Sequence, residues 1–115
     1  MGLVTFEANL DNAVTEQYST ARGPVLRGVE VELAKLFFEK GGGAVEHQHP
    51  EEQIVYCLSG RGRFTVAGDA YEIGPGQASY HGPDVPHGFE ALEDFEGLSF
   101  KRVVAPIYSA TGTLA

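Results

Sequence analysis

The sequence predicts an all-β domain, built as a barrel or sandwich of short strands. Turn signals recur at Gly60, Gly68, Gly74, Gly82 and Gly97, several of them beside proline or aspartate. Their intervals of roughly 6–15 residues suit short strands joined by tight turns. Between the turns, apolar residues alternate with polar ones, as expected where one face of a strand is buried.

Size and composition restrict the class of protein further. The chain has 115 residues, which we interpret as one domain spanning 1–115, and a hydrophobic content of 43%, which argues against disorder. The net charge of −8, with scattered basic residues, gives no surface for nucleic acid. No apolar run reaches the length of a membrane span, and the N-terminus lacks a signal-peptide pattern. A single cysteine fits a reducing compartment, so we expect a cytoplasmic protein with no membrane partner.

The N-terminal third is the least defined part of the sequence. Residues 1–24 are expected to form an N-terminal extension or an edge strand, with 9–21 either helical or extended. Residues 25–38 fit both a strand alternation and a helical stripe, and their valines favour two strands. The glycines at 41–43 are then predicted to form a turn.

The remaining elements are predicted from alternation. Strands are expected over 53–58, 63–66, 71–73 and 98–104. Residues 105–115 are small and polar, and we predict a loose C-terminal tail or a strap across a partner.

Two histidines in the centre of the chain point to a metal. His47 and His49 are separated by one residue, so in a strand both imidazoles would lie on the same face. Imidazole suits divalent transition metals. Gln53 follows four residues later, and His87 lies far downstream in a second glycine- and proline-rich stretch.

The spacing of these residues resembles the first cupin motif, Gly-(x)5-His-x-His-(x)3-Glu-(x)6-Gly. Gly41 and Gly60 bracket the motif, and Gln53 occupies the glutamate position. The second cupin motif is matched at Gly76 and His87, whereas its usual proline, second glycine and asparagine are replaced. The resemblance implies a cupin double-stranded β-helix, or jelly-roll barrel, of the RmlC-like superfamily. Cupins of this size are similar to homodimers that share edge strands, so a homodimer is expected.

The resemblance also implies a ligand set. It consists of His47, His49, Gln53 and His87, holding one divalent transition metal per chain, with Zn, Ni, Fe, Mn and Co all open. A glutamine leaves the site one negative charge short of a glutamate, which favours Lewis-acid chemistry over iron redox cycling.

An alternative is that Glu51 or Glu52 completes the metal site in place of Gln53. Strand parity puts Gln53 on the same face as Val55 and Cys57, which favours the glutamine. Cys57, on that inward face, is predicted to be buried and inert.

Two further residues are candidates for chemistry. His81 is expected in the core or at the rim, with an acid–base role as the alternative. Leu98, Phe100 and Arg102 share one face of the last strand. Because two of them are large and apolar, this face is predicted to be the interior, where Arg102 would bind an anionic or enolic oxygen of the substrate. The alternative places Arg102 at the rim.

Within the cupins, residues 47–61 and 83–88 are similar to the pectin-degradation cupins, which linearise unsaturated uronic acids at a three-His, one-Gln metal site. That subgroup carries an acidic residue and an aromatic residue in the last strand. Arg102 and Val104 stand there in this chain. The resemblance therefore extends to the metal site and not to the substrate.

Three functions follow from this reading. The first is a Lewis-acid metalloenzyme, an isomerase, lyase or cyclase acting on a small oxygenated or anionic molecule such as an unsaturated sugar acid or a polyketide. The second is a metal-dependent dioxygenase. The third is a non-enzymatic cupin that binds or senses a small molecule.

Overall fold

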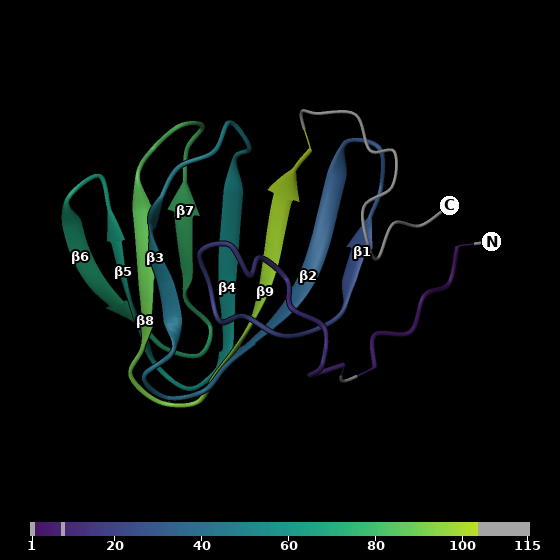
Figure 1. Ribbon diagram of the computed structural model, residues 1–115, viewed down its shortest axis with the longest axis horizontal. Helices are drawn as coiled ribbons and strands as arrows, with labels where there is room; N and C mark the ends of the chain where they lie inside the picture. The colour runs from purple at the N-terminus through teal and green to yellow at the C-terminus, as the bar shows by residue number, and fades with distance from the viewer. Residues whose placement is uncertain (1, 8, 104–115) are drawn as a thin grey trace.

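Two antiparallel β-sheets packed face to face form the body of the protein (Figure 1). The structure, a computed structural model, describes residues 2–7 and 9–103. Every strand pairing in it is antiparallel, and no helix occurs among these residues. The predicted all-β fold is therefore confirmed.

The strands divide into a larger and a smaller sheet. The larger sheet has the order β1-β2-β9-β4-β7 and consists of β1 (Val25–Arg27), β2 (Val31–Phe38), β4 (Gln53–Ser59), β7 (Ala78–His81) and β9 (Phe95–Arg102). The smaller has the order β3-β8-β5-β6 and consists of β3 (Gly43–His47), β5 (Gly62–Val66), β6 (Asp69–Ile73) and β8 (His87–Ala91). From β2 onward the chain changes sheet at almost every step, as in a jelly roll.

The core lies between the two sheets, and it shows which face of each strand is inward. The two strands predicted over 25–38 are present, but the buried face of β2 carries Glu32, Ala34, Leu36 and Phe38. The opposite face carries Val31, Leu33, Lys35 and Phe37, and Val31 is largely exposed. Large apolar residues thus occupy the outer face of β2, while its inner face carries the charged Glu32 near its first residue.

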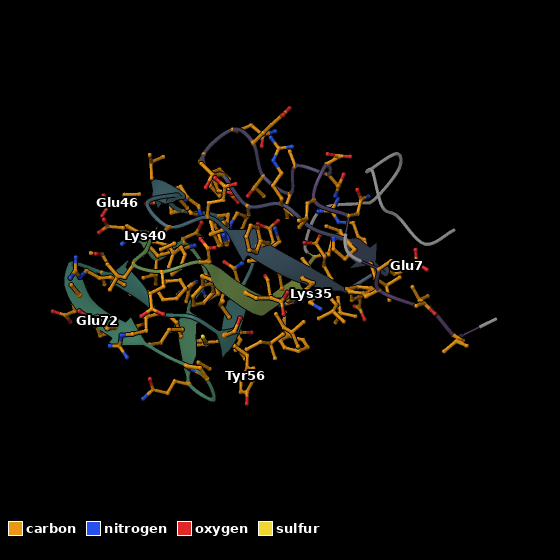
Figure 2. All side chains as sticks on the ribbon, turned by 90° about the horizontal axis from the view of Figure 1, so that it is seen from below. Glu7, Lys35, Lys40, Glu46, Tyr56 and Glu72 are labelled. Atoms are coloured by element: carbon orange, nitrogen blue, oxygen red, sulfur yellow. The ribbon has the colours of Figure 1, made fainter. Side chains whose placement is uncertain are left out.

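One row of the outer face of the larger sheet is apolar on all five strands. One register row joins, from strand to neighbouring strand, Leu26, Leu33, Phe100, Ile54 and Tyr80. Figure 2 shows Tyr56, from a neighbouring row of this face, projecting away from the body of the molecule. The expected homodimer stays a prediction.

The N-terminal segment crosses in front of β4 and β9, beside β3 (Figure 1), and lines one cavity together with inner-face residues of the larger sheet. Residues 9–23 form turns and isolated β-bridges, so the extended alternative describes them better than a helix. Ser19 bridges Ala44, and Arg22 bridges Phe37, which ties the segment to one strand of each sheet. The predicted C-terminal tail over 105–115 lies outside the described residues. Among those described, no helix is long and apolar enough to cross a membrane.

The inward and outward faces of β9 should differ sharply in their contribution to stability. Phe95 is 1% exposed in the core, whereas Phe100 on the opposite face is 45% exposed. Phe95→Ala is expected to lower the free energy of unfolding by about 3–5 kcal/mol because it leaves a cavity. Phe100→Ala, the matched control, should cost a small fraction of this. Urea denaturation of both variants measures the difference, and equal losses would contradict the assigned faces.

Candidate metal centre

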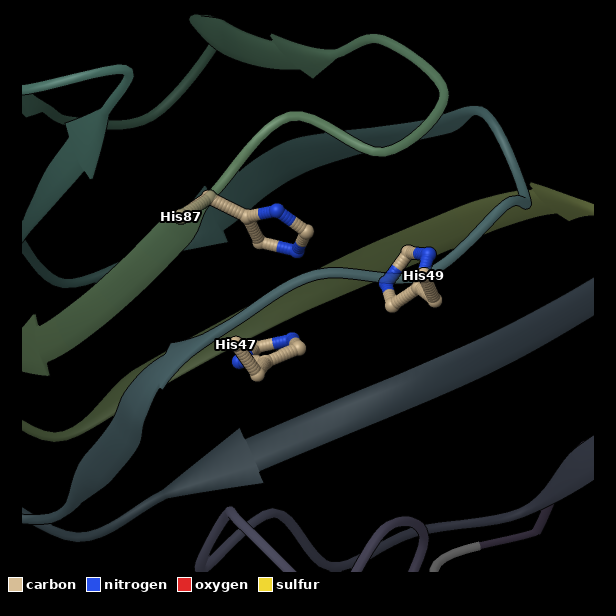
Figure 3. A group of neighbouring side chains, drawn as sticks. All are labelled: His47, His49 and His87. Carbon is tan, nitrogen blue, oxygen red and sulfur yellow. The ribbon is translucent and has the colours of Figure 1, made fainter.

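Three histidine side chains converge at the open end of the sandwich (Figure 3). His47 is the last residue of β3, and it pairs in register with His87, the first residue of β8. His49 lies in the loop that follows β3. One nitrogen from each ring lies within 4.8 Å of those of the other two, the spacing of a three-imidazole metal site. Strand β3 ends at His47, so the turn of the loop, and not strand alternation alone, brings His49 to the site.

Backbone carbonyls orient all three rings in the same way. The Nδ1 atoms lie 2.7 Å from the Val45 carbonyl for His47, 2.9 Å from that of Glu51 for His49 and 2.8 Å from that of Val85 for His87. A carbonyl oxygen only accepts, so each Nδ1–H must donate. Each Nε2 is then left with a free lone pair. Metal-binding histidines have this arrangement, because the Nδ1–H bond sets both tautomer and ring orientation.

The free nitrogens are buried without partners. The Nε2 atoms of His49 and His87 have no hydrogen-bond partner among the described residues. A buried polar atom without a partner is costly and uncommon in proteins. A divalent metal would satisfy these nitrogens, so the residues present fit the predicted group.

The local environment favours the neutral form of His47 and His87. Burial is the main cause that lowers the pKa of His47, and burial with the neighbouring histidines lowers that of His87 to about 4. At neutral pH these imidazoles therefore carry no proton that a metal would have to displace.

His81 lies beside this cluster and differs from it. Its ring stacks on His87 with ring centroids 4.2 Å apart, and it is buried as expected. Both of its nitrogens face polar neighbours: Nε2 lies 2.8 Å from Ser79 Oγ, and Nδ1 lies 3.4 Å from Gln53 Oε1. It therefore has no free lone pair comparable to those of the three converging histidines. Its acid–base role stays a prediction.

Gln53 faces the interior beside the histidines. It lines the same cavity as His47 and His87, and its Nε2 donates to Ser99 Oγ at 2.8 Å. The inward parity of Gln53, Val55 and Cys57 agrees with the sequence prediction. Glu52, the alternative ligand, is exposed and accepts a hydrogen bond from the outward-facing Tyr80, which turns it away from the site.

The predicted orientation of Arg102 is wrong. Arg102 is exposed at the end of β9, on the same outer face as Phe100. The inner face of β9 carries Phe95, Gly97, Ser99 and Lys101. The prediction placed Leu98 and Phe100 inside because they are large and apolar. The apolar residues of β9 are divided between its two faces, so hydrophobicity does not decide which face is inward.

Sequence reasoning missed two charged residues that the fold brings to the site. Lys101 pairs in register with both Gln53 and Glu32, and all three line the cavity that contains His47 and His87. The signal for Glu32 was its alternation with Val31 and Leu33, which places it on the face of β2 opposite to theirs. Tyr18, also missed as a site residue, covers the centre by stacking on His47 with ring centroids 3.7 Å apart.

The comparisons with known proteins agree with this geometry. A sequence profile of the cupin domain matches residues 35–100, more than half of the chain, and the protein therefore belongs to the cupin-domain family. An uncharacterized protein of Methanocaldococcus jannaschii, MJ1618, is 33% identical over 69 residues, which are 59% of this chain and 55% of that protein. The chain thus spans about half the length of this relative.

Solved structures of several cupins share the fold. A Cupin 2 conserved barrel domain protein from Salinispora arenicola superposes with a TM-score of 0.70 at 19% identity, over 90% of each chain. KdgF from Halomonas sp. gives 0.64 at 24% identity, over 71% of this chain and 75% of that one. A putative sugar phosphate isomerase from Acidithiobacillus ferrooxidans gives 0.58 at 25% identity, over 65% and 51%. The predicted cupin fold is confirmed.

Metal binding is the first test of the centre. Wild-type protein is expected to bind one divalent metal per chain, and a His47→Ala, His49→Ala double variant to lose most of it, because only one of the three converging imidazoles remains. Elemental analysis after dialysis against metal measures the occupancy. Arg102→Ala, on the outer face, is the control. Full occupancy in the double variant would exclude the site.

Acid is expected to lower the free energy of unfolding of the metal-free protein through His81 and His87. Burial lowers the pKa of His81 to about 3 and that of His87 to about 4, against 6.5 for an ordinary histidine. The unfolded chain therefore binds protons that the folded chain does not, so the free energy of unfolding falls as pH drops from about 6.5 towards 5. Urea titrations across this range should show the loss. His81→Gln should reduce the slope, and a slope equal to that of the wild type would contradict the assignment.

Proposed function

We propose that this cupin is a metal-dependent enzyme of the Lewis-acid kind, an isomerase, lyase or cyclase that acts on a small oxygenated anion. The observation that carries the proposal is the set of three imidazoles that each place one nitrogen within 4.8 Å of the others. Each ring is oriented by a backbone carbonyl, and burial favours the neutral form of His47 and His87.

The metal would be held by the Nε2 atoms of His47, His49 and His87, and we propose the amide oxygen of Gln53 as the fourth ligand. A three-imidazole site with a neutral amide suits Zn, Ni, Fe, Mn or Co. Bound there, the metal would polarise an oxygen of the substrate. The residues of the chain would orient the substrate and exclude water.

The surroundings of the histidines support small-molecule chemistry. The cavity among them measures about 50 Å³, room for a few water molecules, and Tyr18, Phe64 and Phe89 contribute to its wall. A second cavity of about 510 Å³ shares Val14, Thr15, Glu32 and Lys101 with it. That size is typical of small-ligand sites. A ligand seated in the larger cavity would reach the histidines past Glu32 and Lys101.

The comparisons support a sugar-derived substrate. KdgF is a pectin-degradation cupin, and the Acidithiobacillus protein is described as a putative sugar phosphate isomerase. Linearisation of an unsaturated uronate is an internal rearrangement, in which the ring opens and the enol becomes a ketone. It needs no oxidant or reductant. Such a reaction suits a site with a Lewis acid and a neutral ligand set.

Turnover of an unsaturated uronate by metal-loaded protein is the direct test. Protein stripped with a chelator should be inactive, and activity should return with one equivalent of metal. Loss of the ultraviolet absorbance of the conjugated double bond follows the reaction. The His47→Ala, His49→Ala variant should reduce the rate by a factor of about 100 or more, since second-shell changes alone commonly cost 10–100-fold.

The other functions are separate outcomes of this assay. Oxygen uptake coupled to substrate loss would identify a dioxygenase. Ligand binding without turnover, across unsaturated uronates and related small acids, would identify a binding or sensing protein. Either result would overturn the proposed reaction and leave the metal centre in place.

A further inference from the structure

We propose that Lys101, held by Glu32, is an anion-binding residue that selects substrates carrying a carboxylate beside the oxygen presented to the metal. The inference deepens the proposed function and rests on its metal centre. The sequence analysis predicted that Arg102 would be the cation of the interior. The structure places Lys101 there instead, and Arg102 lies on the opposite face of the strand.

The placement of Lys101 comes from strand register. One row crosses the inner face of the larger sheet from strand to strand, and consists of Arg27, Glu32, Lys101, Gln53 and His81. The rows beneath it are small or apolar, such as Ala34, Ser99 and Val55. The polar row therefore lies at the end of the sandwich that holds the histidines, and Lys101 occupies its centre.

The charges of this row leave one positive charge uncompensated. Glu32 is 7% exposed, and its carboxylate contacts two cations: Arg27 Nε at 2.7 Å and Lys101 Nζ at 3.7 Å. Arg27, Glu32 and Lys101 together carry a net charge of +1. Because Arg27 makes the closer, hydrogen-bonded contact, Lys101 is the cation left for a second anion.

Lys101 is also short of hydrogen bonds. Its side chain is 13% exposed, yet the ammonium group makes no hydrogen bond within the described residues. An ammonium carries three N–H donors, and burying one without acceptors is costly. An anion in the cavity would supply the missing acceptors.

Lys101 lies in the walls of two cavities. Lys101 and Glu32 line both the small cavity that contains His47 and His87 and the larger cavity beneath the N-terminal segment. The positive charge of Lys101 contributes to lowering the pKa of His47 and His87, for which burial is the largest cause. A ligand that spans the two cavities would have one oxygen at the histidines and an adjacent anionic group at Lys101. A carboxylate next to an oxygen donor, as in a sugar acid, has this shape and charge, whereas a neutral sugar does not.

The test compares a charged and a neutral probe on cobalt-loaded protein. Oxalate is a bidentate dianion, and imidazole is a neutral metal ligand of similar reach. Each is titrated against the visible spectrum of bound Co²⁺, with metal retention checked by elemental analysis. Lys101→Met is expected to weaken oxalate binding about tenfold or more, the usual contribution of a hydrogen bond to a charged group. Imidazole binding should not change.

Two further variants serve as controls for this comparison. Lys101→Arg keeps the positive charge and should recover most of the oxalate affinity. Arg102→Met removes the same charge one residue away on the outer face, and should leave both probes unaffected. Unchanged oxalate affinity in Lys101→Met, or an equal loss of affinity in Arg102→Met, would overturn the inference. Imidazole binding in the same variants would show that the metal centre itself is intact. Failure of wild-type protein to bind cobalt would overturn the metal centre and the inference with it.

Discussion

The hydrogen bonds from three imidazole Nδ1 atoms to backbone carbonyls are the constraint on which the site depends. Each carbonyl belongs to a residue two positions from its histidine, so a short piece of backbone orients each ring. Because the donors are fixed at Nδ1, the three Nε2 lone pairs converge and two are buried without partners. Burying these nitrogens without partners is costly, and a divalent cation would supply the missing partner.

The inner face of the larger sheet determines the polarity of the cavity that these histidines line. This face changes from apolar rows around Phe38 and Phe95 to a polar row at Glu32, Lys101 and Gln53. The apolar rows hold the sheets together through burial of hydrocarbon surface. The polar row costs stability unless its charges are paired, and its presence at the mouth of a cavity is characteristic of functional sites.

Gln53 shows how the two sheets cooperate. Its amide is held by Ser99 and faces His81, both on the same sheet, while the three histidines come from the opposite sheet and its loop. The backbone pairing of His47 with His87 is in turn part of the smaller sheet. A metal between them would be shared by both layers of the sandwich. Metal binding and the packing of the sheets are therefore expected to reinforce each other.

The sequence by itself determined the fold class, the family and the identity of the three converging histidines. Each depends on local spacing: glycine-punctuated alternation specifies short strands, and the His-x-His motif with a distant third histidine specifies the centre. Strand periodicity also predicted the inward face of β4, because Gln53 and Val55 lie on a strand whose pattern is unambiguous.

Only the tertiary structure decided which face of β2 and β9 is inside. Both strands carry large apolar residues on the outer face, including Val31 and Phe100, and in β9 hydrophobicity alone assigned the interior to the wrong side. A shift of one residue reverses every side chain of a strand, and long-range register is what brought Lys101, and not Arg102, to the histidines. The stacking of Tyr18 on His47 likewise depends on a contact between segments that local sequence does not encode.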